Sequence, residues 1–273
     1  MDKAYRKDFH RKVDTSELVT CRVAGCDIVV CSMRELVKFI CDHVRELSGD
    51  YIMVTATNEI VMACKDERFY RCQNGGAFSI PDGGPLVTFG KLHGYKTMER
   101  ITGPDLMIEL FKVSEDKGYR HYFYGNTQEV LDRMAERLKA EYPKLQIAGM
   151  HPSRFRNLTE EEDKATVAEI NATHPDFVWF CLGAPKGCYF AADHQGIIDG
   201  VLISVGAGFD YFAGKIKRAP MWMQKHDLEW LYRLYQEPLR LFRRYFYNIP
   251  MFLLYAYVLK RKDSSKNKAK SRG

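Results

Sequence analysis

Apolar residues recur along this chain in two patterns, one at helical spacing and one in short continuous runs. The first clear helical pattern covers residues 32–47, where Leu36, Ile40 and Val44 stand four apart. Ser32 precedes them and is a residue type that often caps a helix, so this segment is predicted to be helical.

Apolar runs and amphipathic segments then follow one another through most of the chain. The predicted strands cover residues 51–55, 77–80, 120–124, 145–148, 177–182 and 201–205. The predicted helices cover residues 59–64, 85–92, 102–115, 127–141 and 159–174. The continuous apolar run at 177–182 is typical of a strand buried on both faces. Strands that alternate with helices indicate a parallel sheet wound from βαβ units, so we predict an α/β, Rossmann-like fold.

The pattern changes near residue 216, and we predict two parts on that basis. Residues 1–215 form the α/β core, and residues 216–273 form a C-terminal appendage. In the appendage, residues 228–246 are predicted to be helical. Residues 245–259 carry no charge and are rich in Tyr and Phe, but a membrane-spanning helix needs about 20 residues, so this run suits the membrane interface. The last residues, 260–273, are expected to be a disordered basic tail.

Charge is distributed unevenly between these two parts. From Lys217 to the end, 14 Lys and Arg oppose four Asp and Glu, whereas the preceding residues carry 27 basic and 31 acidic side chains. A basic tail on a mildly acidic body indicates an anionic partner, either a membrane surface or a nucleic acid. The aromatic, charge-free run favours the membrane, so we expect no nucleic-acid partner. A homo-oligomer stays an open alternative.

Cysteine usage and the first residues indicate a reducing compartment. Eight cysteines are scattered along 273 residues without a CxxC pair, which is typical of free thiols and not of a disulfide framework or a zinc site. The first 13 residues are charged and lack the apolar stretch of a secretory signal.

Asp82 is the most informative single carboxylate of the chain. It follows the strand predicted at residues 77–80, and the carboxyl ends of strands are where open α/β sheets bind ligands. Pro81 cannot extend the ladder, and Gly83 and Gly84 allow a tight turn. Asp-Gly is also a common turn sequence, so Asp82 is either a solvated turn residue or part of a ligand site. The residues at the other strand ends distinguish these two interpretations.

Small polar residues and glycines follow the other predicted strands, and their backbone amides can cradle phosphate. They are Thr55, Thr57, Asn58, Gly125, Asn126, Gly183, Lys186, Gly206 and Asp210. Arg100 is a candidate for binding a phosphate or carboxylate through two hydrogen bonds. Each of these taken alone is ordinary loop chemistry, but all are predicted at one edge of the sheet. No complete dinucleotide fingerprint, P-loop, HExxH or DxD motif occurs, so we predict neither a cofactor nor a metal ion.

Several short motifs occur in one order along the chain. They begin at Pro81, Arg100, Leu182, Val205, Ala213, Leu228 and Glu237. The last two contain Glu-Trp-Leu and Glu-Pro-Leu-Arg. Together the motifs closely resemble the WecG/TagA/CpsF glycosyltransferase family (glycosyltransferase family 26), over about residues 22–255.

The resemblance implies an inverting, metal-independent transfer of an N-acetylhexosamine-type sugar, similar to N-acetylmannosamine, from a UDP-sugar. The implied acceptor is a sugar on undecaprenyl diphosphate, and the product feeds teichoic acid, capsule or a related surface polysaccharide. It also implies a peripheral protein at the cytoplasmic face of a bacterial membrane, with the UDP-sugar donor, the polyprenyl-diphosphate-linked acceptor and the anionic membrane surface as partners.

The resemblance also assigns roles to residues. Asp82 matches the proposed catalytic base, Thr55 and Arg100 match pocket residues, and Arg233 matches an appendage arginine that helps to close the active site. The residues expected at the membrane are Arg240, Arg243, Arg244, Tyr245 and Phe246. An inverting transfer needs one carboxylate to take the acceptor proton, and cationic groups can stabilise the charge on the leaving UDP.

Two positions depart from the family pattern. The usual Thr-x-Asn appears as Thr55-Ala56-Thr57, with Asn58 displaced by one residue, and the usual Gln-Glu after Pro-Lys is Gly187-Cys188. The second change removes hydrogen-bonding groups from the expected pocket. The alternative function is therefore a nucleotide-sugar-binding protein of the same fold with altered catalysis.

Overall fold

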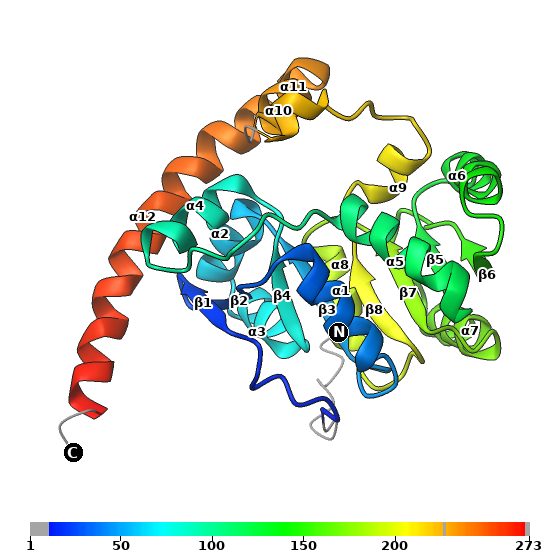
Figure 1. Ribbon diagram of the computed structural model, residues 1–273, viewed down its shortest axis with the longest axis horizontal. Coiled ribbons are helices and arrows are strands. Elements are labelled where there is room, and N and C mark those ends of the chain that lie inside the picture. The colour runs from blue at the N-terminus through cyan, green and yellow to red at the C-terminus, as the bar shows by residue number, and fades with distance from the viewer. Residues whose placement is uncertain (1–10, 226–227, 271–273) are drawn as a thin grey trace.

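One eight-stranded sheet with helices on both faces forms the body of the protein (Figure 1). The computed structural model describes residues 11–225 and 228–270. The strands are β1 (Thr20–Val23), β2 (Cys26–Val29), β3 (Tyr51–Thr55), β4 (Phe78–Pro81), β5 (Arg120–Gly125), β6 (Gln146–His151), β7 (Phe177–Cys181) and β8 (Val201–Ser204). Their order is β1-β2-β4-β3-β8-β7-β5-β6. Only the β1–β2 pair is antiparallel among these strands, so the α/β fold predicted from the sequence is confirmed.

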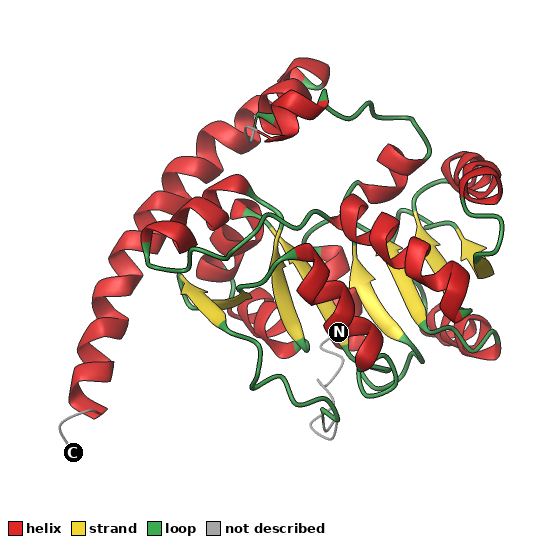
Figure 2. Cartoon of the chain, in the orientation of Figure 1, coloured by secondary structure: helices red, strands yellow, loops and turns green. Residues whose placement is uncertain are grey.

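The helices alternate with the strands along most of the chain (Figure 2). Those of the core are α1 (Met33–Asp42), α2 (Thr57–Lys65), α3 (Glu67–Gly75), α4 (Gly84–Leu92), α5 (Gly103–Lys117), α6 (Gln128–Glu141), α7 (Glu160–Ala172), α8 (Lys186–Asp193) and α9 (Gly208–Phe212). Those of the appendage are α10 (Met221–Lys225), α11 (Glu229–Gln236) and α12 (Pro238–Lys270).

The sheet has a hydrophobic core on each face because successive strand residues point in opposite directions. In β7, Phe177 and Trp179 belong to the core under α1, α5 and α6. Val178 and Phe180 belong to the core under α2, α3 and α8. All four side chains are fully buried, which explains the uninterrupted apolar run in the sequence.

Helix starts follow the capping residues that the sequence shows. Ser32 begins α1 with a reciprocal capping box to Glu35, and Thr159 begins α7 in the same way with Glu162. Helix α1 ends at Asp42, earlier than the sequence pattern predicted, because the chain continues through turns to Asp50. The capping residue Ser32 thus marks the start of α1, whereas no comparable residue in the sequence marks its end.

The β1–β2 hairpin has no counterpart among the sequence predictions. Its two turn residues, Ala24 and Gly25, have φ values of 49° and 90°. A two-residue hairpin turn favours positive φ at such positions, and Asn-Gly or Asp-Gly is its usual sequence. Alanine carries no such signal, so the turn was not visible in the sequence.

The appendage leaves the sheet after α9 and returns along it as a long helix, α12 (Figure 1). Helix α12 packs against α2, and its Phe252 is buried with its ring 6.4 Å from that of Phe89 in α4. The single helix predicted over residues 228–246 is divided between α11 and α12 next to Pro238, a residue that readily starts a helix. Helix α12 continues to Lys270, whereas the sequence predicted a disordered tail from residue 260. Within the described ranges, no helix is long and apolar enough to cross a membrane.

Candidate active site

The carboxyl ends of the parallel strands lie along one edge of the sheet. Near the middle of this edge the half made of β1 to β4 joins the half made of β5 to β8. Strand β4 ends at Pro81, and the chain then crosses through α4 and α5 to β5 in the other half. Strands β3 and β8 lie next to each other at this junction. Such a change of direction is where open α/β sheets bind ligands, and Asp82 stands beside it.

Asp82 is held in place by its backbone. Its N–H donates to the Thr55 carbonyl over 2.9 Å, and its own carbonyl accepts from Arg100 Nε over 2.9 Å. The residue thus bridges the end of β3 and the loop before α5. Its carboxylate is left to face the cavities described next.

The environment of Asp82 makes its carboxylate unusually basic. The pKa of Asp82 is raised to about 6, with burial as the largest cause. Arg100 opposes this rise, and the negative charges of Glu59, Glu229 and Asp105 add to it. A carboxylate with this pKa is ionised at neutral pH and is a better proton acceptor than an exposed one.

A polar cavity of about 480 Å³ opens over the ends of β5, β7 and β8, and we call it the strand-end cavity. Its polar lining includes Glu59, Asp82, Asn126, Thr127, Ser204, Asp210, Lys215 and Arg233. Glycines with positive φ, Gly183 and Gly206, shape its rim. A position with positive φ favours glycine, which brings backbone amides close to a bound group.

A second cavity of about 530 Å³ lies between the core and the appendage, and we call it the appendage cavity. Much of its lining is apolar, from Phe89, Leu92, Trp230, Ile249, Phe252, Leu253 and Tyr257. Helices α11 and α12 supply one wall and α4 supplies another. This cavity therefore exists only because the appendage is docked on the core.

The two cavities share a short stretch of wall. The residues that line both are Ala56, Asp82, Gly206, Ala207 and Arg233. Asp82 and Arg233 are the charged members of this set. A carboxylate and a guanidinium thus stand between a polar cavity and an apolar one.

Comparison with known families identifies the family of this chain. Residues 21–267 match the profile of the glycosyl transferase WecG/TagA/CpsF family. The chain belongs to this family. The resemblance noted in the sequence motifs is confirmed, and the protein is a glycosyltransferase.

Named relatives support the same assignment. A protein of Bacillus spizizenii is 34% identical over 190 residues, which cover 69% of this chain and 72% of the relative. A protein of Bacillus subtilis (strain 168) is 30% identical and covers 86% of this chain and 89% of its own length. One of Staphylococcus aureus (strain MW2) is 27% identical over 88% of this chain and 93% of its own length. All three bear the name N-acetylglucosaminyldiphosphoundecaprenol N-acetyl-beta-D-mannosaminyltransferase.

Most of the residues predicted to bind substrate in this glycosyltransferase line a cavity. Asn126, Gly183 and Asp210 line the strand-end cavity, and Thr57, Asn58 and Arg100 line the appendage cavity. Gly206 and Arg233 line both. Their roles toward substrate stay predictions, but the structure brings them together around Asp82.

Three of the predicted residues line neither cavity. The Thr55 hydroxyl is buried and accepts a hydrogen bond from Gln73 Nε2 over 2.8 Å. Gly125 has a φ of 115°, and a Cβ there would lie 2.6 Å from the Cys181 carbonyl oxygen, so it permits close strand packing. Lys186 is exposed at the start of α8. Thr55 and Gly125 shape the backbone under the site, and their contacts are with protein groups.

The predicted membrane residues divide into three cases. The side chains of Arg240, Arg243 and Arg244 lie outside the part of the chain that the structure describes. Tyr245 lines the appendage cavity, with its ring 6.0 Å from that of Trp230. Phe246 is 73% exposed on α12. Other exposed apolar side chains are Tyr235 on α11 and Leu239, Phe242 and Leu254 on α12.

Arg233 is the charged residue that the appendage contributes to the shared wall. Its Nε is buried without a hydrogen-bond partner among the described residues, and its Nη2 is 3.5 Å from Glu237. Its guanidinium lies 5.2 Å from the ring centroid of Tyr211. A buried N–H without a partner is costly, so an anion in the shared wall would relieve that cost.

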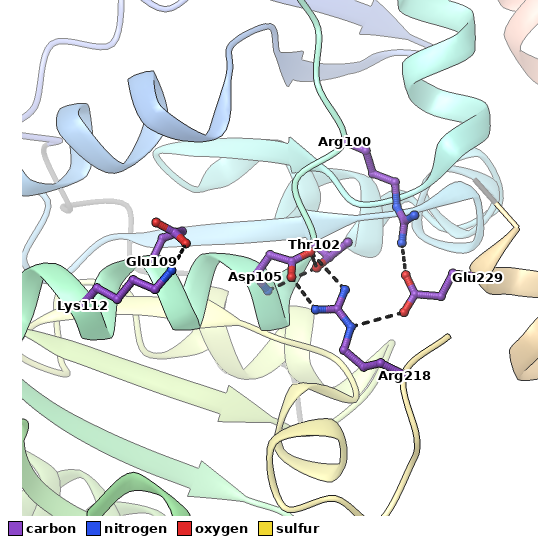
Figure 3. Close-up of polar contacts among 7 residues, drawn as sticks. All are labelled: Arg100, Thr102, Asp105, Glu109, Lys112, Arg218 and Glu229. Atoms are coloured by element: carbon purple, nitrogen blue, oxygen red, sulfur yellow. Dashed lines mark hydrogen bonds and ion pairs between the residues drawn. The ribbon is translucent and has the colours of Figure 1, made fainter. Parts of the chain in front are cut away.

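Two charged residues were not predicted from the sequence to act at the site, although both stand in its motifs. Glu229 and Arg218 line the appendage cavity, and Glu229 accepts a hydrogen bond from Arg100 (Figure 3). The guanidinium that was expected to bind substrate therefore contacts the appendage in this structure. The motifs signalled both residues, but their contacts depend on how the appendage docks.

Both departures from the family pattern lie at this site. Thr57 lines the appendage cavity, and Gly187 and Cys188 are buried and line the strand-end cavity. Within the described residues, no three His, Cys, Asp or Glu side chains gather to hold a metal ion.

Proposed function

We propose that this glycosyltransferase moves an N-acetylmannosamine-type residue from a UDP-sugar to the N-acetylglucosamine of an undecaprenyl-diphosphate-linked acceptor. The names of its relatives supply the sugar and the acceptor. The observation that carries the proposal is the wall shared by the two cavities, which holds both Asp82 and Arg233.

The polar strand-end cavity suits the UDP-sugar donor. The loop amides at Gly183 and Gly206 can bind its phosphates, and Arg233 can reach the diphosphate from the shared wall. The apolar appendage cavity suits the start of a polyprenyl chain, because Phe89, Ile249 and Phe252 offer hydrocarbon surface. The reacting groups then meet at Asp82.

Transfer with inversion follows from this placement. Asp82 takes the proton of the acceptor hydroxyl as that oxygen bonds to the anomeric carbon of the donor. The bond from the anomeric carbon to the diphosphate oxygen breaks, and UDP leaves with the electron pair. Arg233 and the loop amides stabilise the negative charge that develops on the diphosphate.

Transfer can be tested directly with purified full-length protein. UDP-N-acetylmannosamine and a short-chain lipid-diphosphate N-acetylglucosamine should give a disaccharide-lipid product, detected by mass spectrometry. UDP-N-acetylglucosamine serves as the comparison donor. Binding of donors without turnover, read as a rise in melting temperature, would favour the catalytically altered binding protein instead.

The rate of transfer should depend on pH through Asp82. Because burial raises the pKa of Asp82 to about 6, kcat/KM should be constant above that pH and fall tenfold per unit below it. The fall occurs because a protonated carboxyl cannot accept the acceptor proton. Initial rates between pH 4.5 and pH 8 in buffers of constant ionic strength measure this limb, and a limb at the pKa of an exposed aspartate, about 4, would contradict the assignment.

We also propose that α11 and α12 place the enzyme peripherally on the cytoplasmic face of the membrane. The appendage exposes large apolar side chains at Tyr235, Leu239, Phe242 and Phe246. An exposed apolar surface of this kind partitions into the headgroup region of a membrane. A site there would meet an acceptor that is itself anchored in lipid.

Exchanging two of these side chains should abolish membrane binding. Leu239→Ser with Phe246→Ser removes two of the most exposed apolar groups, which are 89% and 73% accessible. The protein should then stop sedimenting with phosphatidylglycerol vesicles, while donor binding is unchanged. Val19→Ser, an exposed apolar position on the core, is the matched control. Retained sedimentation of the double variant, or binding to DNA in place of vesicles, would contradict this role for the appendage.

A further inference from the structure

Four charged residues join the appendage to the core through alternating contacts (Figure 3). Arg100 donates to the Glu229 carboxylate, which lies 3.6 Å from Arg218 Nε. Arg218 in turn donates from both terminal nitrogens to Asp105, with 3.1 Å from Nη2 to Oδ2. We call these four residues the clasp. Its members come from the loop before α5, the start of α5, the segment before α10 and the start of α11.

Glu229 is the central member of the clasp. The residue is only 6% exposed, so its carboxylate is withdrawn from bulk water between two guanidinium groups. A buried carboxylate needs such partners, because an unpaired charge in this position is strongly unfavourable. Glu229 therefore stabilises the docked arrangement, in which the appendage brings it into contact with Arg100 of the core.

The core half of the clasp is itself firmly held. Asp105 accepts from the Thr102 hydroxyl over 2.5 Å at the start of α5. Burial acts to raise the pKa of Asp105, but the hydrogen bonds from Arg218 and Thr102 outweigh it and keep that pKa below its usual value. Asp105 is thus ionised at the pH of the reaction, and Arg218 has a fixed anchor.

The clasp connects directly to the catalytic groups. Arg100 donates through Nε to the backbone carbonyl of Asp82, 2.9 Å away. On the other side, Arg233 is four residues after Glu229 in α11, so both side chains lie on the same face of that helix. The contacts of Glu229 with Arg100 and Arg218 therefore also place Arg233 in the wall shared by the two cavities.

We propose that Glu229 is a positioning residue, which clamps Arg100 and Arg218 and thereby holds Arg233 of α11 opposite Asp82. This role rests on the proposed function of Asp82 and Arg233 in sugar transfer. Two carboxylates and two guanidiniums balance each other within the clasp. Arg233 lies outside the clasp, and its buried Nε has no hydrogen-bond partner among the described residues, so this N–H is offered to the substrate.

The clasp also sets the electrostatic surroundings of Asp82. Charged groups act on this carboxylate from α2 through Glu59, from α5 through Asp105, from α11 through Glu229 and from the intervening loop through Arg100. Tyr211 of α9 stays neutral, because burial raises its pKa. Arg233 lines the same two cavities as Asp82. Neutralising Glu229 removes a negative neighbour of Asp82 and a negative charge that pairs with Arg100. Both changes favour the ionised form of Asp82 and lower its pKa.

Glu229→Gln in the full-length chain tests the proposal, because glutamine keeps the size of the side chain and removes its charge. Misplacement of Arg233 should lower kcat by about 10²-fold. The acid limb of the pH–rate profile should move to lower pH by about one unit. Glu229→Asp, which keeps the charge, should recover part of kcat and keep the original limb. The matched control is Glu141→Gln, which breaks an exposed ion pair with Arg137 on α6.

A second measurement is independent of sugar transfer. Trypsin should cut Glu229→Gln faster than the wild type at Lys215, Lys217 or Arg218, because the segment before α10 loses Glu229 as one of its two carboxylate partners. Glu141→Gln should not change this rate. Faster cutting without transfer by the wild type would support the clasp and contradict the proposed function. Unchanged cutting, or equal losses in the Gln and Asp variants with an unmoved acid limb, would overturn the positioning role.

Discussion

Replacing Asp82 by asparagine is expected to lower kcat about 10²–10⁴-fold, the range that a positioned general base contributes. Asparagine has nearly the same size but cannot accept the acceptor proton. The backbone contacts of this position, from its N–H to Thr55 and from Arg100 to its carbonyl, do not depend on the carboxylate. The loss should therefore appear in the chemical step and leave the fold intact.

Two controls separate the base from a structural effect. Asp116→Asn changes an exposed aspartate on α5 and should leave kcat unchanged. At neutral pH Asp82→Asn should melt no lower than the wild type, because burial disfavours the charge that it removes. The rise in its melting temperature on adding the UDP-sugar donor should match the wild type. Turnover by Asp82→Asn close to the wild-type rate would remove Asp82 from the role of base.

The second large effect is expected for Arg233→Ala, which should lower kcat about 10²–10³-fold, as loss of a charge-stabilising donor does at other transition states. Arg233 stands in the wall shared by the two cavities, and its buried Nε has no hydrogen-bond partner among the described residues. Charge grows on the leaving diphosphate as the sugar is transferred. Removing the guanidinium should therefore affect the transition state more than donor binding.

Arg233→Lys makes the test sharper. Lysine keeps the positive charge but cannot offer two parallel hydrogen bonds, so its kcat should lie between those of the wild type and the alanine variant. Arg133→Ala on α6, where the arginine is exposed beside Glu129, is the matched control. Equal activity of Arg233→Ala and the wild type would show that the appendage does not contribute this cation to the reaction.

Local sequence patterns predicted much of the core correctly. The run at residues 177–182 indicated a strand with both faces buried, and Trp179 and Val178 indeed pack in opposite cores. Ser32 and Thr159 marked the starts of α1 and α7 because a capping residue acts on its own next turn. Asp82 was found for a related reason, since a proline and two glycines after an apolar run mark the end of a strand.

The same local reasoning could not decide which strand-end residues reach the cavities. Thr55 and Thr57 are two residues apart, yet Thr57 lines the appendage cavity and the Thr55 hydroxyl faces Gln73. Residues two apart in a strand point to the same face, but β3 ends at Thr55 and α2 begins at Thr57, so the alternation stops between them. The exact residue at which β3 gives way to α2 therefore determines the site, and composition does not specify that residue.

The sequence by itself determined the fold class, the place of Asp82 and, through the order of its motifs, the glycosyltransferase family. Only the tertiary structure decided that Arg100 contacts Glu229, 129 residues away, and that Arg233 completes the wall beside Asp82. Helix caps and strand runs arise from neighbours in the chain, so they can be read locally. The cavity under α11 and α12 arises from how two distant segments pack, and it exists only in the folded molecule.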